Sequence, residues 1–261
     1  MCWMTSSRDG VEIAYATHGA GSPAIVLVHG WAGNRTYWAD QIRHLAERHQ
    51  VIAVDLGGHG ESGRGRVDWT LPAFGDDVVA VVDEVDVKKV VLVGHSMGGD
   101  AVVHAARRLG DRVVGLVWVD VFRSLGHETT SSPEEVEAFV APFRDDFAAA
   151  IHRFVQRLLP ETVDGRLVDR ISTDMAATSR EVALGSLRYA RNREPAMLAA
   201  LAHITVPIVA INPSTTPADV DSLRRHGVEP MLLEHVGHFP MLEAPHQFNV
   251  ALNAALASFG C

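Results

Sequence analysis

Cysteine, positive charge and long apolar runs are all scarce in this chain of 261 residues. The two cysteines, Cys2 and Cys261, are too few for a disulfide framework and are typical of a protein in a reducing cytosol. Lys and Arg number 23 against 32 Asp and Glu, and the resulting net charge of −9 argues against a nucleic-acid partner. No apolar segment approaches the roughly 20 residues of a membrane-spanning helix, so we expect no membrane partner.

Targeting and cofactor signals are missing from the sequence as well. The first ten residues do not combine a basic stretch with an apolar run, so we expect no signal peptide and a cytoplasmic location. No Gly-x-Gly-x-x-Gly motif follows a predicted strand, and no group of Cys and His has the spacing of metal ligands. We therefore expect neither a cofactor nor a metal, and a small-molecule substrate as the binding partner.

The chain does contain a series of short, nearly continuous apolar runs that are rich in β-branched residues. The runs cover residues 24–28, 51–54, 90–93, 113–119 and 208–211, and helix-length segments lie between them at 35–48, 71–85 and 97–109. Such runs are typical of strands buried on both faces of a parallel sheet. Residues 11–17 alternate instead, which indicates an exposed antiparallel strand. The pattern predicts an α/β fold with a twisted, mostly parallel sheet flanked by helices.

One long stretch interrupts the strands. Residues 122–203 contain no convincing strand. Within them, Ser132-Pro133-Glu134-Glu135 is a strong helix start, with a capping residue, Pro at the first helical position and acids in the first turn. Further helical patterns follow. We therefore predict a core made of residues 1–121 and 204–261, and a helical cap formed by residues 122–203 over the ends of the strands.

A nucleophile motif follows the apolar run at 90–93. Gly94-His95-Ser96-Met97-Gly98 has the G-x-S-x-G pattern between a predicted strand and a predicted helix, which is the context that the motif requires. The glycines allow a sharp turn that exposes the Ser96 hydroxyl, and the amide of Met97 at the helix start can donate to an oxyanion. The alternative is an ordinary Gly- and Ser-rich turn, because so short a pattern also arises by chance.

A second backbone donor is available at the end of the run at 24–28. Val28-His29-Gly30-Trp31 ends this predicted strand, and the N–H of Trp31 is the candidate donor because Gly30 lets the chain pass close to a bound carbonyl. The alternative is that His29 and Gly30 only shape a tight turn, and we expect His29 itself to be structural. Trp31 and Met97 are thus the predicted oxyanion-hole residues.

Four segments together resemble the α/β-hydrolase fold superfamily, in its cap-bearing serine hydrolase and carboxylesterase branch. They are His29-Gly30, residues 55–62, the turn around Ser96 and Gly237-His238-Phe239, in the order and spacing of that family. The resemblance implies a cap inserted after the sixth strand and places the catalytic imidazole at His238. Because serine needs an adjacent base, a neutral His238 would accept its proton. His235 and His246 are the nearby alternatives.

The acid is the place where this chain departs from the resembled family. The resemblance places a carboxylate after the run at 208–211, but the residues there are Ser214, Thr215 and Thr216. Two aspartates remain as candidates. We favour Asp120, which ends the run at 113–119, over Asp219, which lies beyond the usual place and has an alternative role as a helix cap. A dyad without a working acid is a third alternative and predicts a slow enzyme.

These residues predict a serine hydrolase that cleaves small-molecule carboxylic esters through an acyl-enzyme at Ser96, with His238 as general base. A serine at this position argues against epoxide hydrolase and haloalkane dehalogenase chemistry, for which the resembled family uses an aspartate. C–C bond, lactone and thioester hydrolysis and perhydrolysis use the same constellation and stay open as alternatives. A slow-turnover ligand receptor of the same fold is the alternative outside the enzymes.

Overall fold

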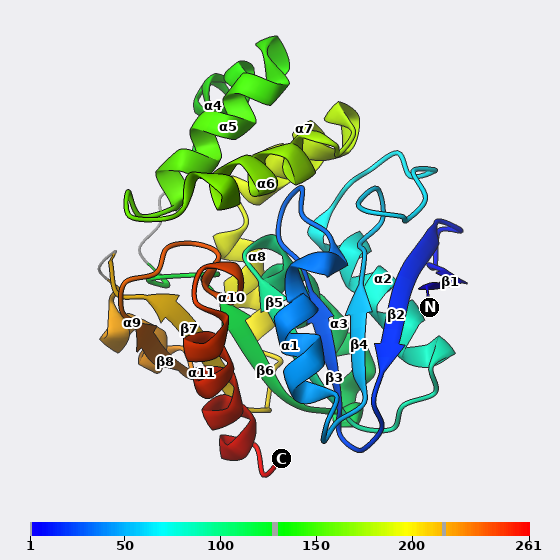
Figure 1. The fold of residues 1–261 in the computed structure, drawn as a ribbon. Coiled ribbons are helices and arrows are strands. Elements are labelled where there is room, and N and C mark those ends of the chain that lie inside the picture. Colours follow the sequence, from blue (N-terminus) through cyan, green and yellow to red (C-terminus); the bar gives the residue numbers. More distant parts are fainter. Residues whose placement is uncertain (1, 127–129, 216–217) are drawn as a thin grey trace.

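The computed structural model describes residues 2–126, 130–215 and 218–261. In that part of the chain, eight strands form one sheet in the order β1-β2-β4-β3-β5-β6-β7-β8 (Figure 1). The strands are β1 (Cys2–Ser6), β2 (Glu12–His18), β3 (Ala24–Val28), β4 (Val51–Val54), β5 (Val90–His95), β6 (Val113–Val119), β7 (Ile208–Pro213) and β8 (Val228–Leu233). β2 pairs antiparallel with β1 and β4, and the remaining neighbours pair in parallel. The predicted α/β architecture with a mostly parallel sheet is therefore confirmed.

The central parallel strands are buried along their whole length. Every residue of β3, β4 and β5 is buried, which explains why these strands are continuous apolar runs in the sequence. β1 is a strand that the sequence does not predict. Its side chains are largely exposed, with Trp3 at 48% and Met4 at 45%, so no buried face marks it as a strand.

Helices cover both faces of the sheet. α1 and α11 lie on one face, and α2 and α3 pack together on the other (Figure 1). The core helices are the 3₁₀ helix η1 (Arg35–Trp38), α1 (Ala39–Leu45), α2 (Leu71–Glu84), α3 (Met97–Leu109), the 3₁₀ helix η2 (Gly110–Arg112), α9 (Val220–Arg225), α10 (Pro240–Glu243) and α11 (Pro245–Ser258). The single helix predicted over 35–48 is wrong in detail, because a 3₁₀ turn capped by Asn34 precedes α1.

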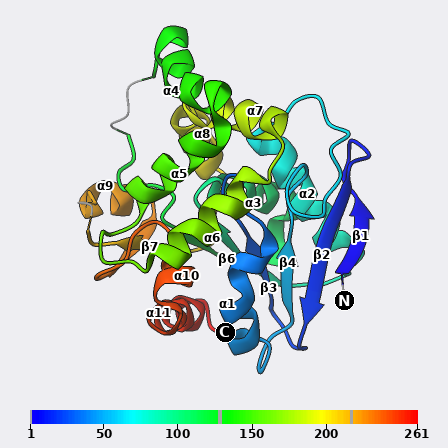
Figure 2. The same cartoon turned by 45° about the horizontal axis from the view of Figure 1, so that its top comes forward.

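Five helices lie between β6 and β7 in the described part of the chain. They are α4 (Pro133–Asp145), α5 (Phe147–Leu158), α6 (Gly165–Ala176), α7 (Arg180–Ala190) and α8 (Glu194–Leu201). α4 to α7 lie above the edge at which the parallel strands end (Figures 1 and 2). The predicted capping box begins α4, since Ser132 and Glu135 each accept a hydrogen bond from the other's amide. The helical cap after the sixth strand is confirmed, while its boundaries at 122 and 203 stay a prediction.

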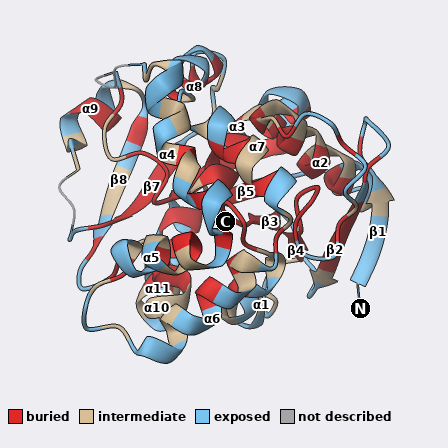
Figure 3. Cartoon of the chain, turned by 90° about the horizontal axis from the view of Figure 1, so that it is seen from above, coloured by how far each residue is buried: buried red, intermediate tan, exposed pale blue. Residues whose placement is uncertain are grey.

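Buried residues concentrate in the sheet and in the helices that pack against it (Figure 3). Trp38 and Trp118 are fully buried in this core. Within the described ranges, no helix combines the length and the apolar character that crossing a membrane requires. The cytoplasmic location stays a prediction.

Candidate active site

Ser96 lies at the sharp turn between β5 and α3. Its backbone has φ 50° and ψ −119°, a conformation that residues with side chains rarely adopt. A Cβ atom at Gly94 would collide with the carbonyl group of Gly98, and one at Gly98 would collide with the carbonyl oxygen of His29. Close backbone contacts therefore require both glycines of the motif, and the strained turn lifts Ser96 to the end of the strand.

His238 donates a hydrogen bond to the carboxylate of Asp120. The distance from His238 Nδ1 to Asp120 Oδ2 is 2.6 Å, although the two residues are 118 positions apart in the sequence. Because an ionised carboxylate only accepts hydrogen bonds, Nδ1 carries the proton and Nε2 keeps its lone pair. This is the tautomer that a general base for a serine hydroxyl requires.

Asp120 is held as an ionised group by its surroundings. It lies directly after β6, is 5% exposed, and also accepts hydrogen bonds from Arg123 at 3.1 and 3.2 Å. Burial by itself would raise the pKa of this carboxyl. The hydrogen bond and charge of His238, together with those of Arg123, outweigh burial and hold the pKa of Asp120 at about 2. A negative charge therefore stands beside the imidazole at neutral pH.

Glu243 and Leu158 hold the loop that carries His238. The Glu243 carboxylate accepts hydrogen bonds from the amides on both sides of the histidine, Gly237 at 2.7 Å and Phe239 at 2.8 Å. The amide of His238 itself donates to the carbonyl of Leu158, the last residue of α5, at 2.9 Å. Cap and core thus position the imidazole together. Glu243 is not among the residues predicted from the sequence, and its signal there is an acidic residue in the first helical turn after Phe239.

His95 supports the same loop from within the nucleophile motif. Its Nε2 donates to the carbonyl oxygen of His238 at 2.7 Å, and the two ring centroids are 4.7 Å apart. His95 is 1% exposed, and burial lowers its pKa well below the usual range, with the neighbouring His238 adding to the effect. The ring is therefore neutral at neutral pH. The second position of a G-x-S-x-G motif accepts any residue, so the sequence carries no signal for this contact.

Trp31 and Met97 bring two backbone amides to the turn at Ser96. Over the described residues, neither amide donates to another backbone group, which leaves both available to a ligand. Gly30 lies against the turn, and a Cβ atom there would be 3.1 Å from the Cβ of Ser96. The Trp31 side chain points to the cap, where its indole Nε1 donates to the carbonyl of Ala183 in α7 at 2.9 Å.

The loop after β7 has hydroxyl side chains where the family resemblance implies a carboxylate. Thr215 Oγ1 donates to the carbonyl of Val236 at 3.0 Å, and Thr216 lies outside the described residues. Asp219 is the N-cap of α9, where its carboxylate accepts from the amide of Ser222 at 2.9 Å. At the usual position of the acid, a hydroxyl group therefore bonds a main-chain carbonyl.

The other histidines considered from the sequence have different environments. His29 is fully buried, its Nδ1 donates to the carbonyl of Gly30 at 2.7 Å, and its Nε2 accepts from the amide of Leu56 at 3.1 Å. Burial lowers the pKa of His29 to about 4, so the ring is neutral and structural. His235 and His246 are exposed to solvent.

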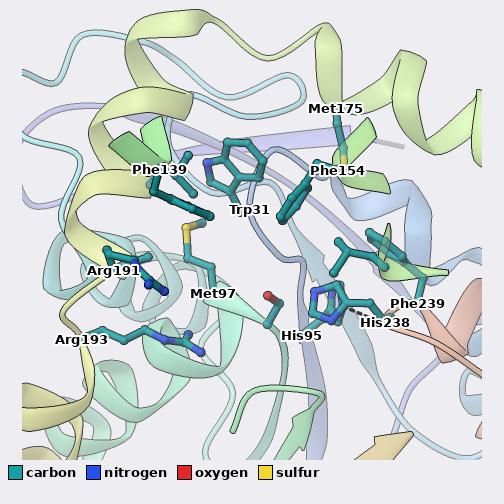
Figure 4. A pocket seen from close by; sticks show the side chains of 14 residues that line it. Trp31, His95, Met97, Phe139, Phe154, Met175, Arg191, Arg193, His238 and Phe239 are labelled. Carbon is teal, nitrogen blue, oxygen red and sulfur yellow. Dashed lines mark hydrogen bonds between the residues drawn. The ribbon is translucent and has the colours of Figure 1, made fainter. Parts of the chain in front are cut away.

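Ser96 and His238 line one cavity of about 240 Å³ between the strand ends and the cap (Figure 4). The walls are mostly apolar and include Trp31, Phe139, Phe154, Leu158 and Met175. No hydrogen bond joins Ser96 to His238 among the described residues, and catalytic hydrogen bonds often tighten only when substrate binds. The same part of the chain contains no group of three potential metal ligands.

Comparison with known proteins identifies the class that this fold and site define. The profile of the alpha/beta hydrolase fold family matches residues 23–194. The chain therefore belongs to the alpha/beta hydrolase fold family.

Individual relatives agree with this class over different lengths. A pimeloyl-[acyl-carrier protein] methyl ester esterase from Neisseria meningitidis is 29% identical over 239 residues, which cover 86% of this chain and 90% of the relative. An esterase from Exiguobacterium antarcticum has a TM-score of 0.87 at 20% identity, covering 98% of this chain and 100% of the other, and supports the fold. An uncharacterized protein from Mycobacterium tuberculosis is 36% identical over 110 residues, which are 42% of this chain and 32% of the relative. The chain thus spans about a third of that relative's length.

Proposed function

We propose that the chain hydrolyses small-molecule carboxylic esters through an acyl-enzyme at Ser96. The observation that carries this proposal is the 2.6 Å hydrogen bond between His238 and Asp120, because the imidazole that it orients shares a cavity with Ser96. The three groups follow the ends of β5, β8 and β6, so they come from separate parts of the chain to one edge of the sheet. This common location supports their proposed roles as nucleophile, base and acid of a catalytic triad.

In the first half of the reaction, His238 Nε2 accepts the proton of Ser96 while the hydroxyl oxygen attacks the ester carbonyl. Asp120 keeps Nδ1 protonated and stabilises the imidazolium that forms. The amides of Trp31 and Met97 donate to the carbonyl oxygen as it gains negative charge, and one such donor is typically worth about 3 kcal/mol in the transition state. The imidazolium then protonates the departing alcohol.

In the second half, water replaces the alcohol. His238 takes a proton from this water as its oxygen attacks the acyl group on Ser96. The imidazolium then returns the proton to the Ser96 oxygen as its bond to the acyl carbon breaks and the carboxylic acid leaves. The apolar walls of the cavity contact the carbon chains of the substrate, as in most small-molecule sites.

An ester is the favoured bond on the strength of one relative. The Neisseria meningitidis protein, which is similar over nearly its whole length, is by name a methyl ester esterase. C–C bond, lactone, thioester and peracid chemistry use the same residues, so a substrate panel that includes these classes ranks the bonds for this chain.

Steady turnover of short p-nitrophenyl esters tests the proposed function. Ser96→Ala is expected to lower kcat roughly 10³- to 10⁶-fold because it removes the nucleophile. Ser131→Ala, at a partly buried serine just before α4 that does not line the cavity, is the matched control and is expected to leave kcat unchanged. Absence of turnover in the native chain would contradict the proposal. A single stoichiometric burst followed by a stable adduct would identify a receptor instead.

A further inference from the structure

The cavity that contains Ser96 carries positive charge on one side. Arg191 and Arg193, from the segment between α7 and α8, line it beside the aromatic walls. The Arg191 side chain extends toward Met97, and Arg193 lies below it in the view of Figure 4. Among the described residues, those that line this cavity include no carboxylate side chain. A local excess of positive charge is notable in a chain whose net charge is −9.

Arg193 has partners within the protein that balance its charge. Its Nη1 forms an ion pair with Asp100 in the first turn of α3, and its Nη2 donates to the carbonyl of Val121 at 2.7 Å. The guanidinium also lies 4.4 Å from the ring centroid of Phe122. Because Asp100 is fully buried, this pair fixes the junction between the cap and α3.

Arg191 has a different environment. Within the part of the chain that the structure describes, its guanidinium forms no salt bridge, and it lies 5.2 Å from the ring centroid of Phe139. An aromatic face attracts a guanidinium without neutralising its charge. Such a contact leaves the N–H groups at the edge of the guanidinium for another acceptor. The cavity therefore contains one oriented positive charge that no carboxylate of the described chain balances.

We propose that Arg191 binds a carboxylate group of the substrate, so that the favoured substrates are esters that carry one carboxylate away from the ester bond. This inference rests on the proposed function. The planar guanidinium matches a carboxylate through two parallel hydrogen bonds. A single negative charge is inferred because Asp100 already balances the charge of Arg193. The apolar walls, with Phe154 among them, contact the carbon chain between the two functional groups.

Two pairs of esters test this inference, and the members of each pair differ only in a terminal carboxylate or methyl group. On the acyl side, monoethyl adipate is compared with ethyl hexanoate. On the alcohol side, the butanoate ester of 6-hydroxyhexanoate is compared with hexyl butanoate. Shorter and longer homologues cover the chain length. The quantity measured is the ratio of kcat/KM for the charged ester to kcat/KM for its uncharged partner, and the two pairs reveal which side of the ester bond faces Arg191.

Substitutions then assign the preference to one side chain. Arg191→Gln is expected to lower the ratio on the order of 10- to 100-fold in one pair, the range of a lost charge-assisted hydrogen bond. Arg191→Lys should retain part of the preference, since it keeps the charge and loses the planar fork. Added salt should lower the ratio in the native chain and have little effect on it in Arg191→Gln, because Arg191 is exposed and salt screens its attraction to a carboxylate.

Arg188→Gln is the matched control. This substitution also removes one positive charge, from a residue of α7 that is close to Arg191 in the sequence. Arg188 pairs with Glu137 and does not line the cavity. If this variant lowers the ratio as much as Arg191→Gln does, or if Arg191→Gln changes the ratio less than about threefold at every chain length, the inference is overturned. Turnover of the uncharged esters would leave the proposed function standing in either case.

A chain that turns over no ester would contradict the proposed function, and binding then tests this inference by itself. Calorimetric titration with monoethyl adipate and with ethyl hexanoate compares the two ligands on the native chain and on Arg191→Gln. Tighter binding of monoethyl adipate that disappears in the variant supports the inference. Equal binding of the two ligands to the native chain overturns it.

Discussion

Replacement of Asp120 by Asn is expected to impair catalysis strongly, whereas Asp219→Asn is expected to have little effect. Asn has the shape of Asp without its charge, so the substitution removes the negative group that lies 2.6 Å from His238. Asp120 is 5% exposed, and water therefore has little room to replace the lost acceptor. Asp219 instead caps α9 through the amide of Ser222, and Asn is an equally good capping residue.

Two losses set the size of the effect at Asp120. The hydrogen bond between His238 and Asp120 joins two charged groups once the imidazolium forms, and such a bond is typically worth about 2 kcal/mol. If the imidazolium of His238 loses a stabilisation of that size, acylation slows about 30-fold. Loss of control over the imidazole tautomer adds to this and can bring the total to about 10⁴. We therefore expect kcat to fall roughly 10²- to 10⁴-fold.

Initial rates on a short p-nitrophenyl ester at saturating substrate test this expectation. Thermal melts of both variants establish that they are folded at the assay temperature. The reasoning is refuted if Asp219→Asn loses more activity than Asp120→Asn. Full activity in both variants would refute it as well, and would favour a Ser–His dyad.

Three further outcomes are expected. Gly30→Ala places a Cβ atom 2.7 Å from His95 Nδ1 and 3.1 Å from the Cβ of Ser96. Because this crowding displaces the turn at Ser96, kcat should fall on the order of 10²-fold in the same assay. An unaltered kcat would contradict the assigned packing. Arg193→Gln leaves Asp100 buried without its partner. The free energy of unfolding should therefore fall by about 3 kcal/mol in denaturant titrations. A change below ~1 kcal/mol would contradict the stabilising role of this ion pair. Burial raises the pKa of Asp100 to about 6, above the 3.8 of the unfolded chain. The folded state therefore binds this proton more tightly, and the free energy of unfolding should fall as pH rises from about 4 to about 6. Asp100→Asn should lack this contribution, so an identical pH dependence in both proteins would refute it.

The sheet and the turn at Ser96 are the parts that the sequence alone predicts well. Strands buried on both faces appear as continuous apolar runs, and the glycines around Ser96 are required by close backbone contacts that any such turn makes. β1 lacks both signals. Its five residues are mostly exposed, so no buried face marks them as a strand. They form a strand because they pair with β2, and this pairing depends on the sequences of both strands.

The contacts of His238 are the part that the sequence leaves open. The choice between Asp120 and Asp219 depends on which strand end lies next to the loop after β8, and local pattern contains no information on that distance. The hydrogen bond from His95 has the same non-local origin, since 143 positions separate it from His238. The bonds that Glu243 accepts from Gly237 and Phe239 are local. The motif predicts which residue types meet, and the order of the strands in the sheet decides which individual side chains do.

Trp31 belongs to two parts of the molecule at once. Its amide faces the turn at Ser96, and its indole is tied to α7 through the carbonyl of Ala183. Any outward swing of the helices to admit a ligand must therefore break this tie or drag the amide with it. Under the proposed function, movement of α7 is therefore expected to displace a donor of the oxyanion hole, because one residue carries both contacts.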